Sequence, residues 1–337
     1  MKFGVFDHMD DAGVPLGQLY ADRLALAEVY DRAGIFGYHL AEHHSTPLGC
    51  AASPSLFLAQ VAQRTKSLRF GPLVYLLPFY HPLRLIEEIC MLDQMSGGRL
   101  ELGVGRGVSP IEVRFYGVDP EQGPRQFVEA LAVIRQGLTS DTLTFSGEFY
   151  TFKEVPMVLK PVQRPHPPLW YGVSKPESVP GAVLAGANIV TLLPPPLART
   201  IFDLYRSEWA RLGRPGDALP LRGLARHVVL AETEAAALAT AQRAYLPWLR
   251  HMELLWTRHG MKLPLNLPPQ IGPMIQAGSA FAGTAAGFKR LLDEQIAATG
   301  ANYIVCDVAF GDISLKEAMR TVELLASEVM PSFADQR

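Results

Sequence analysis

A glycine-rich segment with one arginine, Gly103-Val104-Gly105-Arg106-Gly107, directly follows a short apolar stretch that predicts a β-strand. Glycine lets the main chain approach a ligand closely, and the planar, permanently charged guanidinium of arginine matches phosphate. Ser174 follows the next predicted strand at the start of a helix, where a hydroxyl and free backbone N–H groups favour an anion. The spacing therefore indicates a phosphate site formed by Arg106 and Ser174. The alternative is an arginine ion pair beside an ordinary helix cap.

Titratable side chains follow the second predicted strand, at Glu42, His43 and His44. Neighbours in an extended segment point in opposite directions, so one imidazole is expected to face the centre of the fold and the other to pack in the loop. An imidazole there could move a proton near neutral pH. A dinuclear metal site that adds Asp7 and His8 is disfavoured, because later strand ends supply no further carboxylates and histidines. We therefore predict no metal.

Short apolar strands alternate with amphipathic helices along the whole chain, which predicts an α/β fold with a parallel sheet. Eight strands favour a closed (β/α)8 TIM barrel, because an open dinucleotide-binding sheet would carry a glycine fingerprint after its first strand, where Phe6-Asp7-His8 has none. Active sites of such barrels lie at the carboxyl ends of the strands. His227 lies inside an apolar strand and is expected to be a core histidine. The predicted strands are Lys2–Phe6, Gly37–Ala41, Leu68–Leu76, Arg99–Gly103, Pro168–Val173, Ala187–Leu193, Leu221–Leu230 and Asn302–Ala309.

Two segments interrupt this alternation. Leu143–Phe152 alternates around a Ser-Gly turn and predicts a β-hairpin insertion. Trp248–Ala282 follows the seventh strand, carries prolines and glycines, and is expected to form a long loop with short helices that acts as a lid. We expect one domain over residues 1–337. The predicted helices begin near Leu16, Pro54, Pro82, Pro124, Lys175, Pro195, Glu234, Thr284 and Ser314.

Composition narrows the class of protein. The net charge is −2 and lysine and arginine are scattered, which disfavours nucleic acid and anionic membrane as partners. The three cysteines are odd in number and widely spaced, as expected for reduced thiols in a cytoplasmic protein. The N-terminus reaches acidic residues too early for a signal peptide, and the longest apolar stretch, Gly181–Leu193, is too short to span a bilayer. We expect a soluble, cytoplasmic protein.

Several motifs occur in an order that identifies a known family. Together they resemble the bacterial luciferase-like superfamily of flavin-dependent monooxygenases, over Lys2 to about Pro331. The motifs are AEHHSTPLG (Ala41–Gly49), SP (Ser53-Pro54), LPFYHPLRLIEEICMLDQMSGGRLELGVGRG (Leu77–Gly107), PVQRPHPPLW (Pro161–Trp170), FAGT (Phe281–Thr284) and EVMP (Glu328–Pro331).

The resemblance implies a TIM barrel that binds reduced FMN, or in one branch the deazaflavin F420, at its carboxyl-terminal face. Arg106 matches the family's phosphate arginine, and Ser174 matches the segment that completes the phosphate site. His43, after Glu42, matches a histidine implicated as a catalytic base. Leu73-Val74 falls where the family often has a non-proline cis peptide under the flavin ring. The other residues expected at the cofactor are Phe6 and Tyr75, which would line the pocket, and Glu42, Gly105, Val108 and Val173.

The implied activity is that of a two-component monooxygenase. A separate NAD(P)H:flavin reductase would supply FMNH2, which reacts with O2 at the flavin C4a carbon, and the resulting C4a-peroxyflavin would oxidise a small organic substrate. A homodimer through helices near strands two to four is also expected. Gly105 stands where the catalytic luciferase subunit has a reactive cysteine, so light emission from a long-chain aldehyde is not implied.

Two alternatives stay open. An F420-dependent oxidoreductase would transfer hydride without oxygen, and the longer anionic tail of its cofactor would need extra basic residues, for which Arg114 and Lys175 are the candidates. A non-catalytic flavin-binding subunit would keep the barrel without turnover. The presence of both His43 and Arg106 argues against that second alternative.

Overall fold

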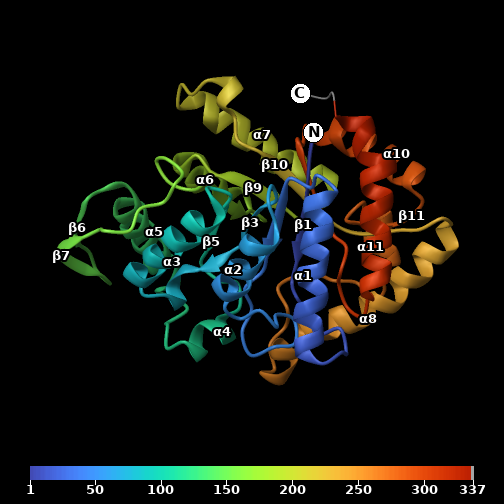
Figure 1. Ribbon diagram of the computed structural model, residues 1–337, viewed down its shortest axis with the longest axis horizontal. Helices are drawn as coiled ribbons and strands as arrows, with labels where there is room; N and C mark the ends of the chain where they lie inside the picture. The colour runs from blue at the N-terminus through green and yellow to red at the C-terminus, as the bar shows by residue number, and fades with distance from the viewer. Residues whose placement is uncertain (335–337) are drawn as a thin grey trace.

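Parallel strands form a nearly closed barrel, and helices surround it (Figure 1). The computed structural model describes residues 1–334. The hydrogen-bonded strand order is β3-β2-β1-β12-β10-β9-β8-β5-β4, and a bridge between Phe70 and Leu100 links the two ends of this order. Since β4 continues β3, the barrel has eight strand positions, and the predicted (β/α)8 fold is confirmed. The barrel strands are β1 (Lys2–Asp7), β2 (Gly37–Leu40), β3 (Arg69–Pro72), β4 (Tyr75–Leu76), β5 (Leu102–Gly105), β8 (Leu169–Gly172), β9 (Asn188–Thr191), β10 (Arg222–Leu230) and β12 (Tyr303–Asp307).

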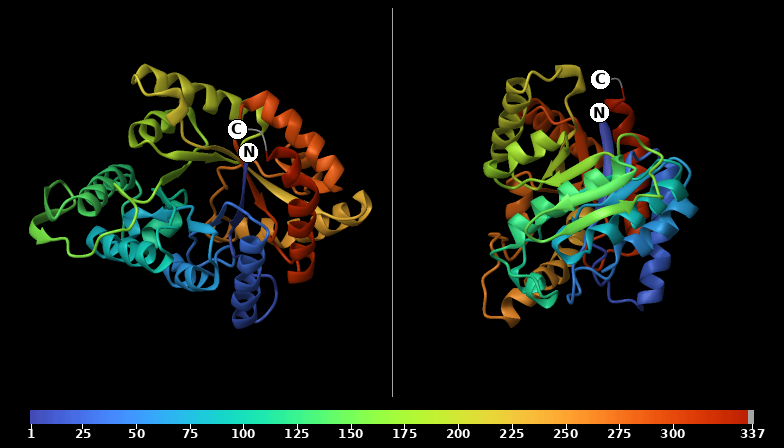
Figure 2. Two further views of the ribbon diagram at one scale, coloured as in Figure 1. Left: turned by 45° about the horizontal axis from the view of Figure 1, so that its top comes forward. Right: turned by 90° about the vertical axis from the view of Figure 1, so that its left-hand side faces the viewer.

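The helices begin where the sequence suits a helix N-terminus. Proline occupies the first turn of α2 and α3, and the side-chain oxygens of Thr233, Thr284 and Ser314 cap α8, α10 and α11. The N-terminus and the turn Met330–Phe333 meet at the amino-terminal side of the barrel (Figure 2), where the Met1 ammonium group donates a hydrogen bond to the Phe333 carbonyl at 3.3 Å. The helices are α1 (Leu16–Arg32), α2 (Pro54–Arg64), α3 (Pro82–Ser96), α4 (Pro110–Phe115), α5 (Gly123–Thr139), α6 (Val179–Ala185), α7 (Pro195–Arg211), α8 (Glu234–Arg258), α9 (Gly272–Gln276), α10 (Ala285–Thr299) and α11 (Leu315–Leu324).

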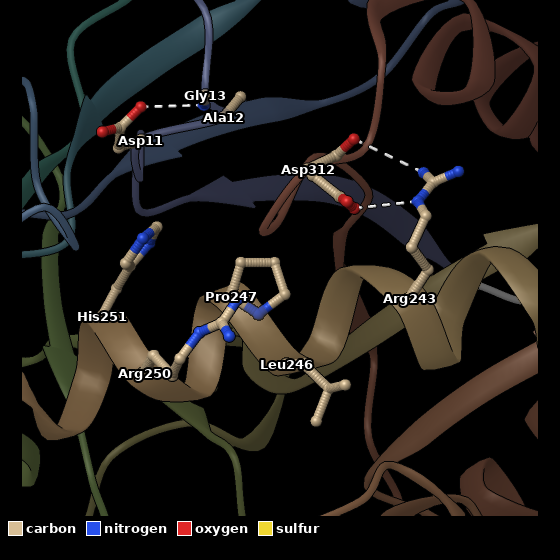
Figure 3. Close-up of a pocket in the computed structure, with 9 residues that line it drawn as sticks. All are labelled: Asp11, Ala12, Gly13, Arg243, Leu246, Pro247, Arg250, His251 and Asp312. Atoms are coloured by element: carbon tan, nitrogen blue, oxygen red, sulfur yellow. Dashed lines mark hydrogen bonds and ion pairs between the residues drawn. The ribbon is translucent and has the colours of Figure 1, made fainter.

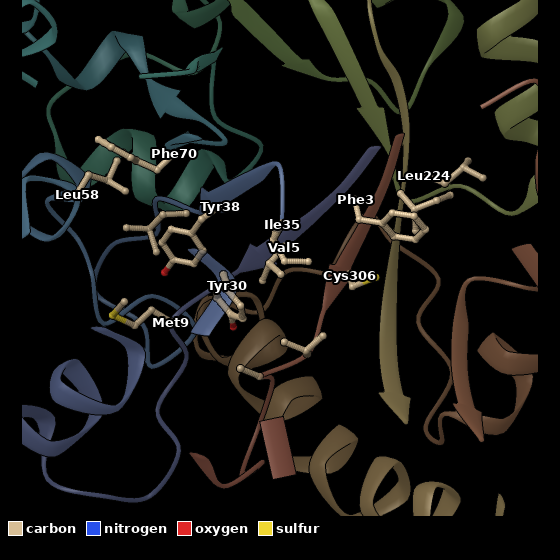
Figure 4. Close-up of a cluster of buried hydrophobic side chains, with 14 of the residues drawn as sticks. Phe3, Val5, Met9, Tyr30, Ile35, Tyr38, Leu58, Phe70, Leu224 and Cys306 are labelled. Carbon is tan, nitrogen blue, oxygen red and sulfur yellow. The ribbon is translucent and has the colours of Figure 1, made fainter. Parts of the chain in front are cut away.

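Two apolar clusters result from the alternation of side chains along the strands. Val5, Leu224 and Cys306 face outward and pack with helix residues such as Tyr30 and Leu58 in the main core (Figure 4). The burial of this layer between sheet and helices is the chief stabilising contribution to the fold. The opposite parity faces inward and fills the barrel, as in other small barrels. The inward cluster contains Leu73, Trp170, Val190, Ala225, Tyr303 and Val305.

Near the amino-terminal end of the barrel, hydrogen bonds connect the polar side chains of the interior. His39 Nε2 lies 2.8 Å from the Tyr303 hydroxyl, and the Glu101 carboxylate accepts hydrogen bonds from Trp170 Nε1 and Arg69. Complete burial lowers the pKa of His39 to about 3, so this imidazole is neutral. Side chains therefore fill the amino-terminal part of the barrel interior, and ligands can reach only the side chains at the carboxyl ends of the strands.

The glycines of β5 make room for a neighbouring strand. A Cβ atom on Gly103 would lie 2.0 Å from the Pro72 carbonyl oxygen, and one on Gly105 would lie 2.4 Å from Val74 Cγ2. Both clashes arise where the chain bends between β3 and β4, at the Leu73-Val74 peptide. The glycine pattern is thus explained first by close strand packing, while Gly107 has a φ of +84° that favours glycine.

The segment after the seventh barrel strand differs from the prediction at both ends. The helix α8 extends through Trp248 to Arg258 despite Pro247 within it, and Ala280–Gly283 forms β11, which pairs in parallel with β10. Between these elements, residues 259–279 form a loop that contains the short helix α9, and the expected short helix is thus confirmed. Pro247 predicted a break because proline removes one helical hydrogen bond, yet the buried side chains of Trp248 and Leu249 hold the helix against the barrel. The short helix α4 was also not predicted.

Three further predictions can be compared with the structure. The β-hairpin is confirmed as β6 (Thr142–Ser146) and β7 (Thr151–Pro156), an antiparallel pair that projects from the barrel (Figure 2). All three cysteines are free thiols, with Cys90 and Cys306 buried. None of the helices within residues 1–334 combines the length and apolar character that a bilayer crossing requires.

Candidate active site

Arg106 and Ser174 lie at the carboxyl ends of adjacent strands. Gly103 of β5 pairs with Trp170 of β8, so Arg106 is three residues beyond one partner and Ser174 four residues beyond the other. Both side chains are exposed. Within residues 1–334 Arg106 forms no ion pair and no side-chain hydrogen bond, which contradicts the alternative of an internal salt bridge. Among the described residues, the guanidinium and the Ser174 hydroxyl thus have no side-chain partner and follow adjacent strands, a combination suited to phosphate.

The surroundings of Ser174 differ from the expected helix start. A 3-10 turn, Pro176–Ser178, precedes α6, and neither has a side-chain cap. Ser174 is thus not an ordinary N-cap. Pro176 and Pro180 have no backbone N–H, so this segment offers an anion fewer donors than the predicted helix start. Val173 is buried beneath this segment, while Val108 on the other side is 75% exposed.

The peptide between Leu73 and Val74 is cis, as the resemblance implied. Leu73 belongs to the barrel-interior cluster and the half-buried Val74 packs against it, so this bend forms part of the barrel wall beside Gly105. The expectation that the Tyr75 side chain lines the pocket is wrong. Its ring is fully buried on the outer side of the strand, and its hydroxyl lies 2.8 Å from Ser55 Oγ of α2.

The three residues after β2 divide as their parity predicts. Glu42 faces sideways, where its carboxylate accepts a hydrogen bond from the Leu76 N–H at 2.9 Å and lies 2.7 Å from His44 Nε2. His44 Nδ1 lies 2.6 Å from the Tyr116 hydroxyl. With both carboxylate oxygens engaged in the loop, Glu42 holds the strand ends together, which contradicts a cofactor-binding role for its side chain.

His43 faces the mouth of the barrel, where its ring lies 5.9 Å from the His8 ring. His43 Nδ1 is 3.4 Å from Glu112 Oε1, and the His44 N–H donates to the same oxygen at 2.8 Å. Burial would raise the pKa of Glu112, but these contacts lower it, so Glu112 is a carboxylate that orients His43. This arrangement leaves His43 Nε2 free of protein partners within residues 1–334. Sequence reasoning missed Glu112 because it lies on the unpredicted helix α4.

A polar group stands on the opposite wall, at the ends of β1 and β12 and inside β10. His8 and His227 both approach the Asp307 carboxylate, and the Phe6 ring packs against His8 at 4.7 Å. Phe6 therefore lies just below the mouth, and its place in a flavin pocket stays a prediction. No group of three His, Cys, Asp or Glu side chains within residues 1–334 is arranged to hold a metal ion.

An open hollow of about 410 Å³ lies beside the mouth (Figure 3). It is lined by the β1–α1 loop, by one side of α8, and by Asp312, which pairs with Arg243 at 3.0 Å. None of the predicted site residues lines it. The hollow is therefore separate from the predicted phosphate and histidine positions.

Comparison with known proteins supports one family. The family model for luciferase-like monooxygenases matches residues 1–302. The chain is 42% identical to the uncharacterized protein y4wF of Sinorhizobium fredii over 98% of this chain and 96% of that protein. It is 32% identical to the oxygenase component of a flavin-dependent trigonelline monooxygenase of Acinetobacter baylyi, over 56% and 53%. It is 31% identical to the 4-hydroxyprotoasukamycin monooxygenase of Streptomyces nodosus, over 95% and 89%.

Solved structures share the fold. Monooxygenase RslO1 from Streptomyces bottropensis superimposes with a TM-score of 0.89 at 25% identity, covering 99% of this chain and 100% of that one. The FMN complex of the oxygenating constituent of 3,6-diketocamphane monooxygenase from Pseudomonas putida gives 0.82 at 20% identity, over 98% of both. The F420-dependent tetrahydromethanopterin reductase of Methanopyrus kandleri gives 0.72 at 20% identity, over 98% and 99%. The last two show likeness of fold alone, but the match of the family model shows that this chain belongs to the luciferase-like monooxygenase family.

Proposed function

We propose that this chain is a flavin-dependent monooxygenase that uses reduced FMN and O2 to oxidise a small organic substrate. The observation that carries the proposal is the Arg106 guanidinium, which has no partner within residues 1–334 and follows the strand next to the one that leads to Ser174. A free cation at that place fits the phosphate of a mononucleotide, and His43 stands at the same mouth to handle protons. Reduced FMN, when bound, supplies the electrons that activate O2.

Each residue has a role that follows from its position. Arg106 and Ser174 bind the phosphate through charge-assisted hydrogen bonds. Leu73, Val74 and Gly105 form the apolar wall at the bend of β3 and β4, with Val173 below and Val108 at the rim. Such a wall suits a flat ring and excludes water from it.

His43 is the residue that moves a proton. Glu112 holds Nδ1, so Nε2 is the atom that exchanges a proton at the mouth. Because the carboxylate stabilises a positive charge on the ring, His43 can accept a proton and later return it. Glu112 thereby acts on the reaction only through the orientation and charge of His43.

A separate reductase and a homodimer are part of this proposal. The relative from Acinetobacter baylyi is named as an oxygenase component, which supports a reductase partner. Leu56 of α2 is 73% exposed, and Met91 and Met95 of α3 are 51% and 42% exposed. These apolar side chains on two adjacent helices support a self-complementary interface. We also infer that the protein works in the cytoplasm as one domain.

The decisive experiment mixes the purified protein with reduced FMN and oxygenated buffer in a stopped-flow instrument. Bound reduced FMN should return to the oxidised-flavin spectrum more slowly than free reduced FMN, and oxygen should be consumed with a substrate present. Tight F420 binding with no effect on reduced FMN would instead favour hydride transfer, for which the exposed Arg114 and Lys175 provide extra positive charge. Flavin binding without any effect on its reaction with oxygen would identify a non-catalytic subunit.

A further inference from the structure

A carboxylate between two imidazoles stands in the top inward-facing layer of the barrel. Ala225 of β10 and Val305 of β12 face the interior, so His227 and Asp307, each two residues further on, face it one layer higher. These two residues are direct partners in the register of β10 and β12. His8 reaches the same layer from the end of β1, two residues after the inward-facing Phe6. Three neighbouring strands therefore deliver these side chains to one place.

The cluster is buried and incompletely satisfied. His227 Nδ1 lies 3.2 Å and His8 Nδ1 lies 3.5 Å from Asp307 Oδ2. The exposed fractions of His8, His227 and Asp307 are 7%, 2% and 4%. Within residues 1–334 both Nδ1 atoms and both Asp307 oxygens are buried without a well-formed hydrogen bond. Buried polar atoms left in this state are costly unless a ligand or ordered water completes them.

The remaining nitrogen of each ring is available to a ligand. The Nδ1 atoms are directed at Asp307, and the Nε2 atoms are not among the fully buried atoms and have no hydrogen-bond partner within residues 1–334. Aromatic rings frame them: Trp248 lies 4.6 Å from the His227 ring and 6.0 Å from the His8 ring, and Phe310 lies 4.6 Å from His227. Trp248 Nε1 is also buried without a partner. The cluster thus combines hydrogen-bond donors with apolar walls, as small-molecule sites do.

The Asp307 carboxylate supplies the negative charge of the cluster. Burial would raise the pKa of Asp307, but the close contacts with the His227 and His8 rings hold it well below its usual range, so the group is a carboxylate. One carboxylate can stabilise one imidazolium, which makes the cluster neutral overall. The other charged groups nearby are already paired: Asp7 with Arg23, Asp10 with His251, and Glu112 with His43. Within residues 1–334 these three pairs leave no unpaired positive charge at the cluster itself.

We propose that the His8–Asp307–His227 cluster anchors the organic substrate by donating a hydrogen bond from an imidazole Nε2 to a neutral acceptor oxygen, such as that of a ketone or amide. This inference rests on the proposed monooxygenase function. It places the substrate against the wall formed by β1, β10 and β12, away from the phosphate residues on β5 and β8. Asp307 is a positioning residue, because it acts by holding the tautomer and charge of the two imidazoles.

The test uses nuclear magnetic resonance of the whole protein with 15N-labelled histidine. Cyclohexanone serves as the neutral probe and cyclohexanecarboxylate as the anionic probe. Cyclohexanone should shift the Nε2 resonances of His8 and His227 with a saturable dependence, and the carboxylate should bind at least tenfold more weakly. Asp307→Asn should weaken the binding of cyclohexanone at least fivefold. His251→Gln removes a second imidazole that lies 3.5 Å from a buried carboxylate, and it should change the affinity less than twofold.

Three results would overturn the proposal: equal binding of the two probes, no shift at these two histidines, or an equal loss in the His251→Gln control. If Asp307→Asn does not fold, His8→Gln provides the same test without removing the central carboxylate. A parallel FMN titration separates this inference from the proposed function. If the protein binds cyclohexanone at the cluster but binds neither FMN nor reduced FMN, the substrate anchor stands and the proposed monooxygenase function is refuted. If it binds FMN but not cyclohexanone, only the proposed anchor is refuted.

Discussion

Replacing Arg106 with alanine should weaken FMN binding about 10-fold to 100-fold. Arg106 is exposed and forms no ion pair within residues 1–334, so the substitution breaks no contact inside the protein. The loss then comes from the phosphate alone. A hydrogen bond to a charged group contributes about 1.5–3 kcal/mol, and about 1.4 kcal/mol is a tenfold change in Kd. Because solvent and salt screen an exposed guanidinium, the effect should be smaller at physiological ionic strength and larger at low salt.

Quenching of flavin fluorescence measures the affinity, with riboflavin as a probe that lacks the phosphate. Arg106→Ala should leave riboflavin affinity within about twofold of the parent, since the apolar wall at Val74 is untouched. Arg114→Ala is the matched control: its arginine is also exposed, forms no ion pair within residues 1–334, and lies on the following helix. Unchanged FMN affinity in Arg106→Ala, or an equal loss of FMN and riboflavin, would refute the assignment of the phosphate to this residue.

Three further substitutions test other parts of the argument. Gly103→Ala places a Cβ 2.0 Å from the Pro72 carbonyl oxygen, so it should lower the free energy of unfolding in urea by about 1–3 kcal/mol or more. Gly181→Ala in α6 is the control: nothing lies within 4 Å of its Cβ, so this variant should be neutral or stabilising. Glu112→Gln should lower turnover about tenfold or more while FMN affinity stays within about twofold, because only the orientation and charge of His43 change; equal losses in both would indicate general damage. Burial opposes ionisation of Asp31, but hydrogen bonds from Ser67 and the adjacent backbone lower its pKa to about 2. Its contribution should be present above about pH 4 and be lost as the pH falls towards 2, so the stability difference between the parent and Asp31→Asn should shrink over that window and not at neutral pH.

Much of the fold and part of the site followed from local patterns in the chain. Strand–helix alternation predicted the barrel because each strand must bury one face against helices. The two histidines after β2 were predicted to diverge, and His43 and His44 do so. The single domain and the roles of Arg106 and Ser174 stay predictions.

The errors share a physical origin in contacts distant along the chain. Pro247 has a local tendency to end a helix, but packing of α8 on the barrel outweighs it. Tyr75 was expected at the pocket because its strand ends there, yet the bend at Leu73-Val74 turns the next side chain towards α2. The glycines of β5 indicated a ligand, although their smallness is required by a neighbouring strand that no local pattern shows. In each case the competing interaction lies on another element.

The polar cluster at Asp307 shows which additional rule would have found it. Within one strand, the side chains at residues 225 and 227 of β10, or at 303, 305 and 307 of β12, must face the same way. A histidine or aspartate of inward parity that follows an inward-facing apolar residue by two positions therefore lies one layer nearer the mouth. His227 is buried, as expected of a core histidine, and parity could also have placed it in the same layer as Asp307. Parity does not give the order of the strands around the barrel. That order places β12 between β1 and β10, so that the Asp307 carboxylate contacts both imidazoles.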